Sequence, residues 1–176
     1  MKLRKTNAEL SLLSSALLLG HAVPLAFWML SKGRIPKPAP IIPWALTILI
    51  VAHAVLSILL MIKAHKDGGS HKGRIYPKMI VPTIIQRMTG VLMLVFTIPH
   101  IAGATGIIVP SQAVHAVLPP LFFAIALTHT AVSFSKALIT LGVGDAQLIK
   151  KVDIIVKIVC GITMLADIIG FYLYVV

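Results

Sequence analysis

The chain has 176 residues, of which 58% are hydrophobic and 12% are charged. Soluble domains are about 45–50% apolar and about a quarter charged, so this composition excludes an ordinary soluble globule and also a disordered chain. The single cysteine excludes a disulfide scaffold, a Cys-ligated iron–sulfur or zinc site and a covalently attached haem. A formal charge of +11 would suggest nucleic acid in a soluble protein, but the placement of the charges favours a membrane.

Five stretches are long and apolar enough to cross a bilayer, for which a helix needs about 20 residues. Because a chain in lipid must satisfy its backbone hydrogen bonds internally, each stretch is predicted to be a helix. We therefore expect one all-α integral membrane domain over residues 1–176, with the first four helices forming an up-down bundle. The expected spans are Leu10–Leu30, Ile41–Ile62, Ile84–Val109, Ala113–Leu141 and Ile154–Val176.

Lys and Arg are distributed unevenly between the two ends of these spans. Only Lys32, Arg34 and Lys37 fall on one side, and the other thirteen of the sixteen fall on the side of the N-terminus. This bias predicts a cytoplasmic N-terminus and an external C-terminus. The basic face is thus interpreted as a determinant of topology, or as a surface for anionic lipid or an acidic partner, and not as a nucleic-acid site. The connections, including a Gly/Asp-containing loop over 142–152, are too short for another domain.

Histidine carries the chemical information in this sequence. An ionisable residue inside a bilayer is costly and marks a functional site. Four such residues on four consecutive spans are harder to explain as structural residues than one would be. The fifth span has none, His65 and His71 are expected to be solvated in the cytoplasmic loop, and His115 is expected at the outer mouth of the fourth span. The intramembrane histidines are His21, His53, His100 and His129.

The order of the helices suggests how these histidines meet. In an up-down ring the first and third helices are diagonal, as are the second and fourth, so each diagonal can hold two imidazoles around a flat macrocycle such as a haem. At 1.5 Å rise per residue, His100 falls on the outer half and His129 on the inner half. We therefore predict an outer pair of His21 with His100 and an inner pair of His53 with His129. An outer pair of His100 with His115 is the alternative.

Three polar residues extend this picture. Ser133 and Lys136 share the helix face of His129, so the lysine could meet a haem propionate or simply reach the interface. Asp167 is the one acid inside a span, where it could transfer protons or act as a neutral hydrogen-bonding acid. Zinc fits these residues less well, because it requires closely spaced tetrahedral ligands.

The segment Gln86-Arg87-Met88-Thr89-Gly90, with His100 ten residues after the glycine, resembles the Q-R-x-T-G segment of succinate:quinone oxidoreductase cytochrome b subunits. The stretch from His129 to Gly142 is similar to the later haem-ligand helix of that family. The resemblance covers essentially the whole chain and, with a histidine on each of the first four spans, indicates the single-chain, five-helix, dihaem type of membrane anchor.

This resemblance implies two non-covalent b-type haems, an outer one held by the first and third spans and an inner one held by the second and fourth. It places Arg87 near a propionate or the quinone, with menaquinone the expected quinone. It also implies flavoprotein and iron–sulfur subunits on the cytoplasmic face of a prokaryotic cytoplasmic membrane, in a complex that could be homo-oligomeric. The family's proton routes do not transfer, because residues 31–40 contain no acid and Leu127-Thr128 precede His129.

The sequence thus predicts an electron-transferring anchor that cannot oxidise a dicarboxylate alone. It would connect the soluble subunits of a succinate dehydrogenase or fumarate reductase with membrane quinone. One alternative is the cytochrome b subunit of another quinone-linked enzyme, such as a hydrogenase or formate dehydrogenase. Alternatives of a different kind are a small transporter or channel with a histidine-lined path, and a structural anchor without haem.

Overall fold

The computed structural model describes residues 2–39, 41–66, 77–108 and 111–174, without the side chains of residues 64, 65, 77–81 and 112. Within these ranges the chain is all-helical, and all five helices are long and apolar enough to cross a membrane. The predicted all-α, multi-pass character is thereby confirmed. His71 and the side chain of His65 lie outside the described residues. The helices are α1 (Lys2–Leu30), α2 (Ile41–Lys66), α3 (Pro77–Ala104), α4 (Gln112–Leu141) and α5 (Ala146–Tyr174).

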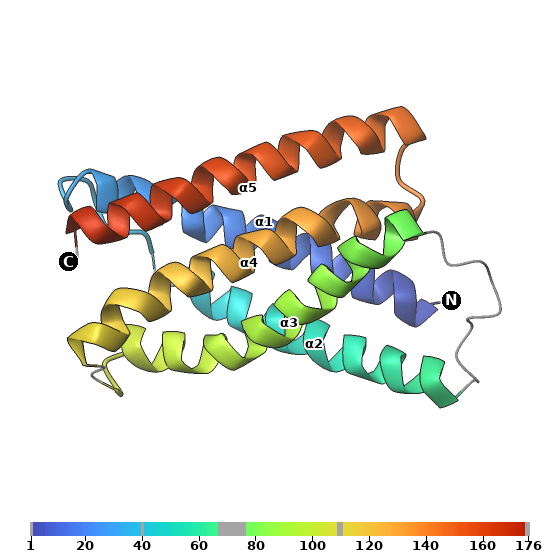
Figure 1. Ribbon diagram of the computed structural model, residues 1–176, viewed down its shortest axis with the longest axis horizontal. Helices are drawn as coiled ribbons and strands as arrows, with labels where there is room; N and C mark the ends of the chain where they lie inside the picture. Colours follow the sequence, from blue (N-terminus) through green and yellow to red (C-terminus); the bar gives the residue numbers. More distant parts are fainter. Residues whose placement is uncertain (1, 40, 67–76, 109–110, 175–176) are drawn as a thin grey trace.

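Consecutive helices run in opposite directions, and the two termini lie at opposite ends of the molecule (Figure 1). Helices α1, α3 and α5 begin seven or more residues before the expected spans, and α3 begins at Pro77 where Ile84 was expected. α1 begins at Lys2, well before Leu10, and α5 begins at Ala146, inside the stretch that was expected to be a loop. The carboxylate of Asp145 accepts a hydrogen bond from the Leu148 N–H at 2.7 Å, which is the geometry of a helix N-cap.

The third and fourth helices end at glycines. α3 ends at Ala104, before the expected Val109, and Gly106 follows with a φ of +75°. α4 ends at Leu141 and is capped by Gly142, whose left-handed backbone lets its N–H bond back to the carbonyl of Ile139. A left-handed residue after the last turn satisfies carbonyls that have no helical partner, so glycine sets where the helix stops.

The packing order across the molecule is α2, α1, α4 and α3, with α5 lying against both α1 and α4. α2 and α3 do not pack closely against each other. The four helices therefore form an arrangement that is closed where α1 packs against α4 and open between α2 and α3. The most buried core residues, Ala126, Leu127 and Cys160, come from α4 and α5. The fold therefore leaves a space beside its core.

Helix α5 packs tightly because small and polar residues face its neighbours. A Cβ on Gly170 would lie 3.0 Å from the Met29 Cβ, so only glycine permits this approach to α1. On the α4 side, the Tyr172 hydroxyl donates to the Ala116 carbonyl at 3.0 Å. That carbonyl lacks its helical donor because Pro120 has no N–H, and a side chain of α5 replaces it.

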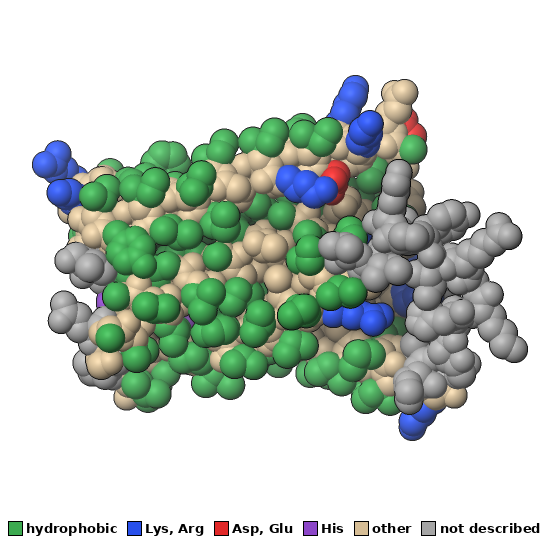
Figure 2. Space-filling view, viewed as in Figure 1, with side chains coloured by type: hydrophobic (Ala, Val, Ile, Leu, Met, Phe, Trp, Pro, Cys, Tyr) green, Lys and Arg blue, Asp and Glu red, His purple; other side chains and the backbone are tan. Residues whose placement is uncertain are grey.

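The surface agrees with a lipid-facing protein. In Figure 2 the Lys and Arg side chains lie at the left end and over the right-hand part of the face, and mainly uncharged side chains cover the stretch between. Large hydrophobic side chains such as Ile48, Ile98 and Ile162 are more than 60% exposed. Contiguous apolar exposure of this kind is costly in water and favourable in a bilayer, so we describe the chain as a multi-pass membrane protein.

Candidate functional site: two histidine pairs between the first four helices

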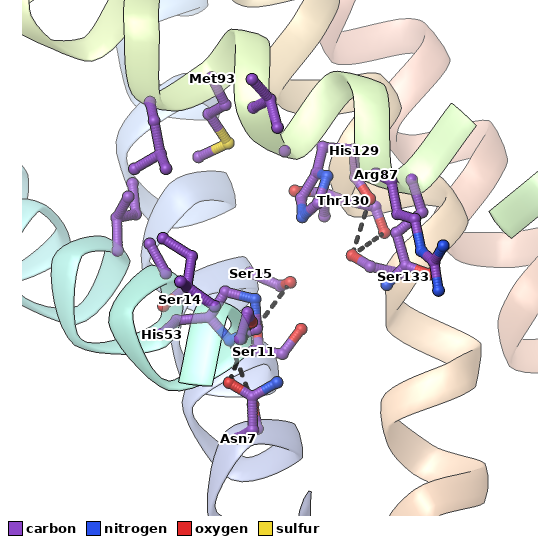
Figure 3. A pocket seen from close by; sticks show the side chains of 18 of the residues that line it. Asn7, Ser11, Ser14, Ser15, His53, Arg87, Met93, His129, Thr130 and Ser133 are labelled. Atoms are coloured by element: carbon purple, nitrogen blue, oxygen red, sulfur yellow. Dashed lines mark hydrogen bonds between the residues drawn. The ribbon is translucent and has the colours of Figure 1, made fainter. Parts of the chain in front are cut away.

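The space between α1, α2, α3 and α4 contains a pocket of about 870 Å³, which we call the inner pocket. Its volume lies in the range of cofactor and small-molecule sites, about 300–1,000 Å³. Figure 3 shows His53 and the α1 serines on one side of the pocket and His129 with Arg87 on the other. Its polar and ionisable lining residues are Arg4, Asn7, Ser11, Ser14, Ser15, His53, Ser57, Thr83, Gln86, Arg87, His129, Thr130 and Ser133.

His53 reaches the inner pocket from α2 and is held by the first turns of α1. Its Nδ1 lies 3.2 Å from the backbone carbonyl oxygen of Asn7. The Ser57 hydroxyl, one turn further along α2, donates to the side-chain oxygen of Asn7 at 3.2 Å. The backbone carbonyl can only accept, so Nδ1 carries the proton and Nε2 keeps its lone pair.

His129 reaches the same pocket from α4 and lies against α3. Its Nδ1 is 3.1 Å from the Thr89 hydroxyl oxygen. Gly90 lies directly beside the ring, since a Cβ at that position would be 3.1 Å from the His129 Cε1. Two residues of the Q-R-x-T-G segment, Thr89 and Gly90, thus lie against the His129 ring.

The structure brings the histidines together in two sets. His53 and His129 both line the inner pocket and are close enough to interact electrostatically. His21 and His100 likewise interact with each other, and the His100 ring stacks on Phe122 with centroids 4.5 Å apart. In both sets the partners come from diagonal helices.

The outer set and its alternative partner differ in their surroundings. His21 is partly buried, and its buried Nδ1 has no hydrogen-bond partner among the residues that the structure describes. His115 instead has its ring 5.6 Å from that of Phe171 on α5. The geometry thus favours His21 over His115 as the neighbour of His100.

The three expected propionate or quinone neighbours lie in different environments. The Lys136 ammonium donates to the Gln86 side-chain oxygen at 2.8 Å and lies 3.4 Å from the Thr83 hydroxyl. Arg87 is exposed and lines the inner pocket. Ser133 is 2% exposed, and its hydroxyl donates to the His129 carbonyl at 2.7 Å. Of these three residues, Arg87 is therefore the cation that could receive a carboxylate at this pocket.

Asp167 is fully buried in α5 and is not among the residues that line the inner pocket. Neither of its carboxylate oxygens has a hydrogen-bond partner within the described part of the chain. It lies on the same buried helix face as Thr163 and Gly170, and Gly170 packs against α1. An unpaired carboxyl in this position favours the neutral, protonated form, because burial disfavours the charge.

The polar face of α1 is the part of the site that the sequence analysis missed. The available indication was spacing: these residues recur at intervals of three and four, as one face of a helix requires. The Ser14 hydroxyl is buried without a hydrogen-bond partner among the described residues, so a polar group could be accommodated next to it. The residues of this face are Arg4, Asn7, Ser11, Ser14 and Ser15.

The imidazoles of His53 and His129 suit a ligand that binds two nitrogen donors. Within the described ranges, no group of three or more His, Cys, Asp or Glu side chains could hold a metal ion. A tetrahedral site is therefore not formed there, whereas two facing imidazoles can hold a haem iron from its two sides. Comparisons with protein-family models, with curated proteins and with solved structures gave no match.

Proposed function

We propose that this chain is a dihaem cytochrome b membrane anchor of a succinate:quinone oxidoreductase, as the sequence resemblance implies. The observation that carries the proposal is that His53 and His129, from diagonal helices, line one pocket, while His21 and His100 lie on the other diagonal. A random placement of four membrane histidines would not be expected to yield two such pairs. The Q-R-x-T-G segment adds support, because it lies against one of the four.

The residues of the inner pocket fit a b-type haem. His53 and His129 would hold the iron through Nε2, since each Nδ1 faces a hydrogen-bond acceptor. When bound, such a haem supplies reversible one-electron transfer. Arg87 and the polar face of α1 would meet the propionates, while the surrounding apolar side chains exclude water. His21 and His100 would be the iron ligands of the outer haem.

The location of the charges supports a partner on one side only. The helix ends near the N-terminus carry Lys2, Arg4 and Lys5, and further lysines follow on α2 and α5, whereas the other end carries three cations. In the proposed orientation this basic end faces the cytoplasm, where iron–sulfur and flavin subunits would dock. The chain then connects those subunits with quinone, expected to be menaquinone, in the membrane of a prokaryote.

The test is the amount of b-type haem in the purified full chain, measured as the pyridine haemochrome against protein mass. We expect two haems per chain in the wild type and a lower content in each of the four single His→Ala variants. His115→Ala is the matched control, since it also removes a histidine from α4 but should keep both haems. One haem in the wild type, or loss of a haem in His115→Ala, would overturn the two-pair assignment.

The soluble subunits that co-purify decide which enzyme the anchor serves. Flavin and iron–sulfur subunits with succinate dehydrogenase or fumarate reductase activity would support the proposal. Hydrogenase or formate dehydrogenase subunits would instead support the alternative of another quinone-linked cytochrome b. An intact protein without haem would exclude electron transfer and favour the transporter or the structural anchor.

A further inference from the structure

The Thr89 hydroxyl links His129 to the backbone of α3 through two successive hydrogen bonds. Its oxygen lies 2.7 Å from the Ile85 carbonyl, to which it donates its proton, and 3.1 Å from the His129 Nδ1. A hydroxyl has one proton, so once it donates to a carbonyl it can only accept from the histidine. The proton of the imidazole is therefore on Nδ1, and Nε2 has a free lone pair.

A second residue of α3 lies close to the same ring. Gly90 follows Thr89 in the chain, and its position leaves 3.1 Å between a Cβ built there and the His129 Cε1. The backbone of Gln86 also interacts with the imidazole. One turn of α3 thus lies along the Nδ1 and Cε1 side of the His129 ring.

His53 provides the internal comparison. Its Nδ1 faces an acceptor in the same way, but the acceptor is the backbone carbonyl of Asn7. A substitution of Asn7 leaves that carbonyl in place, whereas a substitution of Thr89 removes the acceptor itself. Of the two histidines in the inner pocket, only His129 has a side-chain hydroxyl beside its Nδ1, in addition to the backbone of Gln86.

From these contacts we infer that Thr89 is a positioning residue for the inner haem, which sets the tautomer and orientation of His129 so that Nε2 can bind iron. This inference rests on the proposed function and extends it, because it assigns a task to one residue of the Q-R-x-T-G segment. A hydrogen bond from Nδ1–H to an acceptor makes an imidazole a stronger donor to a metal. Losing the acceptor should therefore weaken binding and favour the reduced metal.

The experiment compares Thr89→Val, which keeps the shape but lacks the hydroxyl, with Thr89→Ser, which keeps the hydroxyl. The matched control is Thr105→Val, because Thr105 makes the same bonds to the carbonyls of Ile101 and Ala102 but does not line the pocket. The readouts are the midpoint potential of each haem and its affinity for the chain. The inner haem is identified as the one that His53→Ala removes.

We expect Thr89→Val to raise the midpoint potential of the inner haem alone and to weaken its binding about 10- to 100-fold. Thr89→Ser should restore both quantities, and Thr105→Val should change neither. If the wild type binds two haems but Thr89→Val leaves the inner haem unchanged, the positioning role is refuted and the proposed function stands. If the wild type binds no haem, the proposed function itself fails.

A measurement on the wild type keeps the inference testable if Thr89→Val does not fold. The ¹⁵N spectrum of the haem-free, histidine-labelled chain reports which ring nitrogen carries the proton, with His129 assigned through His129→Gln. The inference requires the proton on Nδ1. A His129 protonated on Nε2 would refute it.

Discussion

The contact between Gly90 and His129 allows a quantitative test of the inner site. In Gly90→Ala the new Cβ would lie 3.1 Å from the His129 Cε1 and 3.5 Å from its Nδ1. Carbon atoms pack favourably at about 3.5–4.0 Å, so the ring must withdraw by about 0.4 Å or more. Without haem it can move into the inner pocket. With Nε2 bound to iron it cannot.

The cost of overpacking at such a contact is typically about 1–3 kcal/mol. Because the strain exists only in the haem-bound state, it appears as lost affinity, roughly 5- to 150-fold for the inner haem. The matched control is Gly161→Ala, since a Cβ at Gly161 meets nothing within 4 Å. Both variants gain the same backbone restriction from glycine to alanine, so this contribution cancels in the comparison.

The assay is a haem titration of the purified, haem-free full chain in detergent, followed by absorbance. Both variants are made in a His21→Ala background, so that only the inner site remains. Equal affinities for Gly90→Ala and Gly161→Ala would show that α3 does not confine the His129 ring. That result would refute the reasoning for this site.

Three further predictions follow from other contacts. Asp167→Asn should keep both haems and melt no lower than the wild type by scanning calorimetry, because neither carboxylate oxygen has a partner within the described chain; a marked loss of stability would reveal a missed interaction. Tyr172→Phe should lower the free energy of unfolding, measured by chemical denaturation, by about 1 kcal/mol, because the Ala116 carbonyl loses its donor. An unchanged free energy of unfolding would contradict this role. Lys136→Met should weaken the binding of the inner haem several-fold at low salt and less at high salt, because it breaks the hydrogen bond to Gln86 and removes a cation. A loss of haem affinity that does not depend on salt would argue for an effect of packing alone.

Much of the fold follows from local sequence. The number and type of the helices depend on the length of each apolar run and on the need to satisfy the backbone in lipid, and both are properties of neighbouring residues. The boundaries were harder to predict. The early start of α5 at Ala146 depends on the Asp145 cap, and the early start of α1 continues a polar helix beyond the apolar run.

The four membrane histidines could be selected from the sequence because an ionisable side chain in an apolar span is costly wherever it lies. Their pairing depended on one assumption, an up-down order of short connections, which places alternate helices on diagonals. The sequence alone left His115 open as a partner of His100. In the structure His21 is the histidine that interacts electrostatically with His100, and the His115 ring lies beside Phe171 of α5.

The tertiary structure alone decided what surrounds each histidine. The Asn7 carbonyl beside His53 and the Thr89 hydroxyl beside His129 come from helices distant in sequence, and their approach depends on how each helix is rotated about its axis. Local composition does not fix that rotation, whereas packing of whole helix faces does. The sequence by itself thus determined which helices form, and it selected the membrane histidines as the candidate site residues. The separation of α2 from α3, and the pocket between them, followed only from how the five helices pack.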